Sequence, residues 1–210
     1  MFRYEAYSYR SLTMTNKYFL RKGTIIGLYR IQASKSFNDV RKGDLGGHIR
    51  WKHNLSQEGN CWIYDNASAI GHSEVTGDAQ LRNQCVVSDH CKITGKSTVR
   101  DSAVVKDSAR VDGHADISGK ATISRLSVVK GYAEITDAAE VTDYVTVSDD
   151  VLVKGSAVIK DKAVLCNCVE VKDKAVIGGD VEVRGYLEIG KNTVILDNDE
   201  LKRITGEMDE

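Results

Sequence analysis

A repeat of six residues runs through most of this chain and limits what it can fold into. Stepping by six from Cys61 to Thr193 gives 23 positions, of which 18 hold Cys, Ala, Ser or Thr. Two residues after each, every position except Ala69 holds Ile, Val or Leu. Two further on, 21 of the 23 hold Gly, Asp or Asn, the exceptions being Arg125 and Lys191. Apolar residues two apart followed by a turn former indicate short strands, and they cannot form the stripe of an α-helix.

Three such hexads close one triangular coil of 18 residues, and successive coils stack at about 4.8 Å per layer. We therefore predict an all-β protein built as a parallel β-helix over residues 61–197. The 23 hexads correspond to about 7.7 coils. Uniform coils without insertions favour the left-handed hexapeptide type. Each coil would bury its small and aliphatic residues against the next coil.

The two ends of the chain lack the repeat. Residues 1–60 hold most of the aromatic side chains, and 11 of the 14 Phe, Trp and Tyr residues lie within the first 64 positions. The stretch YFLRKGTIIGLYRI reads as strands. Since an open coil end exposes unpaired backbone groups, we expect residues 1–60 to form a β-rich cap. Residues 198–210 should form a tail or short helix, with Leu201 and Ile204 available to cover the last coil.

The charge balance excludes several classes of partner. Lys and Arg number 29 against 30 Asp and Glu, whereas a protein held to nucleic acid by its phosphates needs an excess of positive charge. No apolar run approaches the roughly 20 residues of a membrane span, and the first residues lack the apolar core of a secretory signal. We therefore expect a cytoplasmic protein that binds neither nucleic acid nor membranes.

The five cysteines fit a reducing compartment because their number is odd and their spacing forms no disulfide framework. Cys61, Cys85 and Cys91 fall on inward positions and should be core residues. Cys166 and Cys168 flank a turn, and we interpret them as plain surface thiols because no second Cys pair or nearby His accompanies them. We expect no metal site and no cofactor.

The repeat is similar to the hexapeptide motif of left-handed β-helix acyltransferases. The stretch NLSQEGNCWIYDNASAIG, which leads into it, resembles phage and prophage proteins often labelled acyltransferases. In the common enzyme motif the turn former directly follows the aliphatic residue, whereas here it comes one position later, as in Ile63-Tyr64-Asp65. No catalytic residue of the family is therefore carried over to this chain.

Acyltransferases of that kind typically use a histidine base near a cleft between subunits, often formed by an extruded loop. The register of residues 61–197 never slips, so no loop is extruded. The candidate bases are His72, His90 and His114, which share the last position of their hexads. His72 and His90 are 18 residues apart and should stack in successive coils. No Asp or Glu lies beside them in this column, which continues as Ser108, Leu126 and Tyr144, so we expect them to be solvated corner residues.

One outward face of the predicted prism is mostly apolar. Read every 18 residues, its valines are Val86, Val104, Val158, Val176 and Val194. The resemblance implies that such a face packs into a homo-oligomer, most simply a trimer. Two observations argue against this: Val is favoured in strands in any case, and Glu140 interrupts the face. The other candidate contacts are the aromatic residues Trp51 and Trp62.

Two functions are compatible with these patterns. The first is a non-enzymatic, oligomeric binding or structural protein of phage or prophage type, whose partner would be a virion component or a host protein. The missing loop and the missing carboxylate beside the histidines favour it, and it predicts no release of CoA from acetyl-CoA. The alternative is an acyl-CoA-dependent acyltransferase with its site between subunits.

Overall fold

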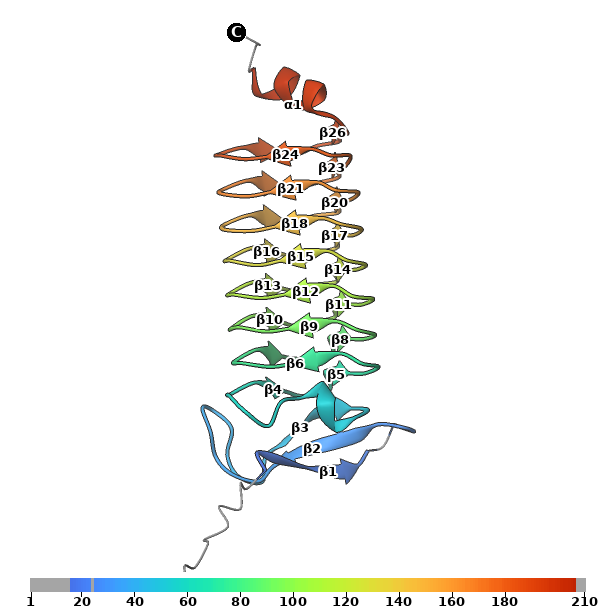
Figure 1. The fold of residues 1–210 in the computed structure, drawn as a ribbon, viewed down its shortest axis with the longest axis vertical. Helices are drawn as coiled ribbons and strands as arrows, with labels where there is room; N and C mark the ends of the chain where they lie inside the picture. The colour runs from blue at the N-terminus through green and yellow to red at the C-terminus, as the bar shows by residue number, and fades with distance from the viewer. Residues whose placement is uncertain (1–15, 24, 207–210) are drawn as a thin grey trace, which may run out of the picture.

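The computed structural model describes residues 16–23 and 25–206. These residues form a stack of triangular coils with the strands β1 to β3 at one end and the helix α1 at the other (Figure 1). No helix of the described residues is both long and apolar enough to cross a lipid bilayer. The all-β, parallel β-helical fold class predicted from the repeat is confirmed, while the left-handed sense of the coil stays a prediction.

Three sheets form the sides of the prism. The eleven-stranded sheet contains, in spatial order, β1 (Tyr18–Lys22), β2 (Tyr29–Ala33), β3 (Leu45–Ile49), β5 (Ser68–Ala69), β8 (Val86–Val87), β11 (Val104–Val105), β14 (Thr122–Ile123), β17 (Glu140–Val141), β20 (Val158–Ile159), β23 (Val176–Ile177) and β26 (Val194–Ile195). The eight-stranded sheet contains β4 (Trp62–Ile63), β7 (Gln80–Leu81), β10 (Thr98–Val99), β13 (Asp116–Ile117), β16 (Glu134–Ile135), β19 (Leu152–Val153), β22 (Glu170–Val171) and β25 (Glu188–Ile189). The seven-stranded sheet contains β6 (Glu74–Val75), β9 (Lys92–Ile93), β12 (Arg110–Val111), β15 (Val128–Val129), β18 (Thr146–Val147), β21 (Val164–Leu165) and β24 (Glu182–Val183).

The register within the coils follows the repeat. Val104 pairs with Val86 on one side and Thr122 on the other, so Cα partners are 18 residues apart and every strand pair from β4 to β26 is parallel. The two inward residues of each strand segment form the core, as for Ala103 and Val105, which are both 0% exposed. The outward residue of each strand is left on the surface of its sheet.

The turn position of each hexad adopts the left-handed conformation that the residue pattern predicts. Every sixth residue from Asp65 to Lys191 has positive φ, including the two exceptions Arg125 (58°) and Lys191 (59°). Asp serves this position as well as Gly because its carboxylate accepts a hydrogen bond from the next coil, as Asp107 does from the backbone N–H of Arg125 at 3.0 Å. Stacking of the coils therefore holds even an arginine in this conformation.

The parallel pairing of the eleven-stranded sheet extends to a strand before residue 61. β3 pairs in parallel with β5, with His48 opposite Ser68 and Ile49 opposite Ala69. β2 pairs antiparallel with β1 on one side and with β3 on the other, and the three strands continue the eleven-stranded sheet. A Cβ atom on Gly47 would lie 2.3 Å from the carbonyl oxygen of Ala67, so only glycine permits this approach. The cap is thus an extension of one sheet and not a separate domain.

A buried lysine closes the first coil. Lys17 is 1% exposed, and its Nζ donates hydrogen bonds to the carbonyl oxygens of Cys61 at 2.9 Å, Glu58 at 3.2 Å and Gly59 at 3.4 Å. Burial lowers the pKa of this amine, and the neighbouring Cys61 acts in the opposite direction. Carbonyl groups at the end of a solenoid have no further coil whose N–H groups could pair with them. The Lys17 ammonium supplies the missing hydrogen-bond donors.

The last coil is covered by α1 (Asn198–Thr205), which confirms the expected short helix. The Asp197 carboxylate accepts a hydrogen bond from the backbone N–H of Glu200, and Gly206 ends the helix in the left-handed conformation. Leu201 packs against the core, whereas Ile204 stays 48% exposed. The prediction that both side chains cover the coil is therefore correct for Leu201 and wrong for Ile204. Residues 207–210 lie outside the described residues.

Candidate functional site

Three imidazole rings form a column at one corner of the prism. His72 lies between β5 and β6 and His90 between β8 and β9, so both occupy the corner that joins the eleven-stranded and seven-stranded sheets. Their ring centres are 5.2 Å apart and the planes differ by 18°. His53, in the 3-10 turn η1 (Lys52–Asn54), stacks below His72 at 5.6 Å and 9°. The predicted stacking of His72 on His90 is confirmed.

His53 was not found by sequence reasoning. It lies 19 residues before His72 and not 18, because the chain enters the first coil through η1 and outside the hexad register. All three imidazoles are exposed. The stacked planes direct the ring nitrogens sideways and not toward a common point. No group of three or more His, Cys, Asp or Glu side chains among residues 16–23 and 25–206 is placed to hold a metal ion.

His114 stands apart from this column. It lies between β12 and β13, at the corner that joins the seven-stranded and eight-stranded sheets, and its ring stacks on Tyr132 at 4.8 Å. The structure thus brings His72 and His90 together and leaves His114 at another corner. Of the three histidines predicted from the sequence, His72 and His90 can act within one site of a single subunit and His114 cannot join them.

The histidine column borders the apolar face predicted from the sequence. We call this surface the valine face, the outward side of the eleven-stranded sheet that carries Val86, Val104, Val158, Val176 and Val194. Val194 is 48% exposed and the other four are half-buried by their neighbours in the ladder. Thr122 and Glu140 interrupt the valines, as expected. A second molecule packed on this face would have the imidazole column at the edge of the contact.

The two tryptophans have different environments. Trp51 is 50% exposed and remains a candidate contact. Trp62 points outward from β4, as the repeat predicts, yet it is 1% exposed because Tyr18 and Phe37 of the cap pack edge-to-face against it, with ring centres 6.3 and 5.4 Å away. The proposal of Trp62 as a partner contact is therefore wrong: its function is to join the cap to the first coil.

The cysteines have the predicted distribution. Cys61, Cys85 and Cys91 are 0% exposed, and burial raises the pKa of the Cys85 and Cys91 thiols to about 12. Cys166 and Cys168 are half-buried, and all five cysteines are free. Thiols that stay protonated are poor nucleophiles, so the buried cysteines are structural.

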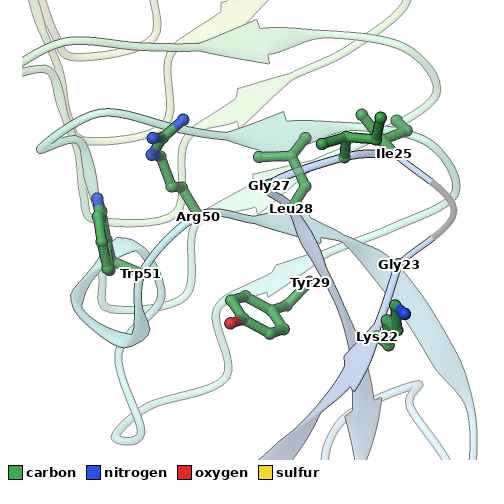
Figure 2. A pocket seen from close by; sticks show the side chains of 9 residues that line it. Lys22, Gly23, Ile25, Gly27, Leu28, Tyr29, Arg50 and Trp51 are labelled. Carbon is green, nitrogen blue, oxygen red and sulfur yellow. The ribbon is translucent and has the colours of Figure 1, made fainter.

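A pocket of about 520 Å³ opens in the cap. It lies between the β1–β2 hairpin and the segment just before η1, and Figure 2 shows Arg50 and Trp51 on one side with Lys22 on the other. Its wall is Lys22, Gly23, Ile25, Ile26, Gly27, Leu28, Tyr29, Arg50 and Trp51. Sequence reasoning identified Trp51 as a contact but not the pocket, because the hairpin lies outside the repeat.

Comparison with known proteins gives one partial similarity. A segment of 55 residues, 26% of this chain, is 47% identical to a protein of Escherichia coli (strain K12) described as "Uncharacterized acetyltransferase YdcK". The match covers 17% of that protein's length. No protein-family model matches the chain. The chain therefore has the parallel β-helical fold and a distant relative that is named as an acetyltransferase.

A buried histidine adds a group that sequence reasoning did not single out. His48 of β3 is 3% exposed, and neither ring nitrogen makes a hydrogen bond to another described residue. Burial lowers its pKa, the charge of Arg30 on the adjacent strand lowers it further, and the backbone of Asn66 opposes both more weakly. The ring is therefore held neutral at the end of the valine face.

This neutral ring makes stability depend on pH. Its pKa is lower in the folded chain than the ordinary value of 6.5, so below 6.5 the unfolded state binds more protons and the free energy of unfolding falls. We expect the melting temperature to drop as the pH falls through this value, and to drop less in His48→Leu. Thermal melts followed by circular dichroism measure this. The control is Thr98→Leu, which changes a half-buried outward side chain that does not titrate and should melt with the wild-type pH dependence. Equal pH dependence in all three proteins would contradict the assignment.

Proposed function

We propose that the protein is an acyl-CoA-dependent acyltransferase, with its site at the corner where the histidine column meets the valine face. The observation that carries the proposal is the position of three exposed imidazoles along the edge of an apolar sheet face. The partial similarity to a protein named as an acetyltransferase supports the reaction class. The sequence patterns alone favour a non-enzymatic binding protein over an acyltransferase. This similarity makes the acyltransferase the preferred function.

In this proposal the histidine column acts in general-base catalysis. One imidazole would take the proton of an acceptor amine or hydroxyl while the acceptor attacks the thioester carbonyl, and CoA would leave as its thiol after gaining a proton. His53, His72 and His90 follow one another along the prism axis, about one layer apart. An acceptor bound beside any of these three layers would therefore lie close to an imidazole. A second subunit on the valine face would supply the other wall and exclude water.

We expect the purified protein to release CoA from acetyl-CoA when a suitable amine or sugar acceptor is present. Removing a general base typically costs about 10²- to 10⁴-fold in rate, so one of His53→Ala, His72→Ala and His90→Ala should lose activity to that extent and thereby identify the base. His114→Ala is the matched control at another corner and should keep the wild-type rate. A thiol-reactive dye measures the free CoA after the protein's own thiols have been subtracted.

The outcome that contradicts the proposal is full activity in all three column variants, or no CoA release across the acceptor panel. The second result would favour the other function, a non-enzymatic oligomeric protein that binds a virion or host partner through the same face. An origin in a phage or prophage stays a prediction of the sequence resemblance.

A further inference from the structure

Four of the six large exposed apolar side chains in the described part of the cap line one pocket. Ile26 is 101% exposed, Ile25 51%, Trp51 50% and Tyr29 44%, and all four line the pocket between the β1–β2 hairpin and Arg50. Exposed apolar surface costs about 25 cal/mol per Å² relative to its burial. Single exposed residues are ordinary, whereas a cluster of them around a hollow is typical of a binding surface.

Two cations border this apolar surface. Lys22 and Arg50 line the pocket, and no Asp or Glu does. Neither side chain forms an ion pair or a side-chain hydrogen bond with another residue of the described part of the chain. The Arg50 guanidinium lies over Trp51, 5.7 Å from the ring centre, a contact that leaves its N–H groups available. The pocket therefore has an unbalanced positive charge beside an apolar wall.

A ligand that satisfies both features has an acidic group and an apolar body. We propose that this pocket binds a long-chain carboxylate, with the carboxylate on Arg50 and the aliphatic chain against Ile25, Ile26 and Trp51 (Figure 2). Arginine suits this position because its planar fork can donate two parallel hydrogen bonds to one carboxylate. Lys22, on the other side of the pocket, adds attraction for the negative charge. The inference does not depend on acyl transfer.

The chain contains its own probe for this binding. It has two tryptophans, of which Trp62 is 1% exposed in the core and Trp51 is 50% exposed in the pocket wall. A change in tryptophan emission on adding ligand therefore reports on Trp51. Laurate, added below its micelle concentration, is expected to give a saturable blue shift because the aliphatic chain removes water from the indole. The neutral analogue dodecanol should bind up to about fivefold more weakly, the loss expected for one missing exposed charge pair.

Two variants separate the polar and apolar parts of the site. Arg50→Gln should weaken laurate binding by up to about fivefold and leave dodecanol binding unchanged, because only the charge contact is lost. Ile26→Ser should weaken both ligands. The matched controls are Lys96→Gln, an exposed cation at another corner, and Leu126→Ser, which is 52% exposed elsewhere on the coil. Both controls should bind laurate as the wild type does.

Three results would overturn the proposal. One is the absence of a saturable shift, and another is an equal loss of affinity in Lys96→Gln and Arg50→Gln, which indicates nonspecific attraction of anions. The third is binding to vesicles of anionic phospholipid without binding of monomeric laurate, which would make the hairpin a membrane-surface contact. As a check on location, calorimetry with Trp51→Phe should still detect laurate while the emission shift disappears.

Discussion

The Val111→Asp variant is expected not to fold. Val111 is 0% exposed on the inward side of β12, between Ile93 and Val129 of the adjacent coils. An unpaired carboxylate at such a position costs several kcal/mol or must be protonated. That penalty is comparable to the whole stability of a typical domain, about 5–15 kcal/mol. Since each coil contacts only its neighbours, a broken central coil also separates the two halves of the stack.

Circular dichroism tests this expectation, and the adjacent residue provides the control. Arg110 precedes Val111 but points outward, and its ladder partner is Lys92. Arg110→Asp introduces the same carboxylate in water. It loses the exposed ion pair with Asp112 but keeps Lys92 as a cation in its ladder, so it should keep the β-sheet spectrum and the cooperative melt. A folded Val111→Asp protein at neutral pH, with a melting temperature near that of the wild type, would contradict the inward placement of the third hexad position.

Replacing Lys17 with Met is expected to destabilise the protein by about 3 kcal/mol, because buried carbonyl groups lose their donor. The methionine keeps most of the volume and the apolar stem, so the change removes the hydrogen bonds to Glu58, Gly59 and Cys61 together with the contact of the ammonium with the Phe37 ring. For a chain of this length the loss corresponds to a fall of roughly 10 °C in melting temperature. Hydrogen exchange should also quicken in the first coil before it does in the last.

The control for Lys17→Met is Lys22→Met, which removes an exposed lysine a few residues along the same segment. We expect its melting temperature to stay within a degree or so of the wild type, since exposed substitutions usually change stability by less than about 0.5 kcal/mol. If the two variants melt together, the three carbonyl groups find another donor and Lys17 does not close the coil.

The coil could be derived from the sequence because its structure is local and repeated. The residue types of each hexad indicate which side chains face inward and which residue has positive φ. The same residue types recur 18 residues later in the next coil. Even Arg125, a poor residue for its turn, is positioned correctly by the register of its neighbours. The histidine column followed from the same arithmetic, since equal spacing in the chain becomes stacking in space.

The cap could not be derived in this way. Its contacts join residues far apart in the chain without a period, such as Lys17 to Cys61 and Tyr18 to Trp62. The repeat assigned Trp62 to the surface correctly as a strand position, but it carried no information on the hairpin that covers it. The entry of β3 into the sheet and the addition of His53 to the column both depend on that hairpin.

We propose that the valine face assembles subunits and so completes a site at the histidine corner. Light scattering, with CoA release measured on the same samples, tests it in a Val104→Glu/Val176→Glu double variant, whose changed residues have no acidic ladder neighbours. Gln80→Glu/Thr146→Glu places equal charge on the other two sheets as the control. We predict an oligomeric, active wild type and control, and a folded, monomeric and inactive valine variant. A monomeric wild type, or a valine variant with wild-type mass and activity, would contradict the claim.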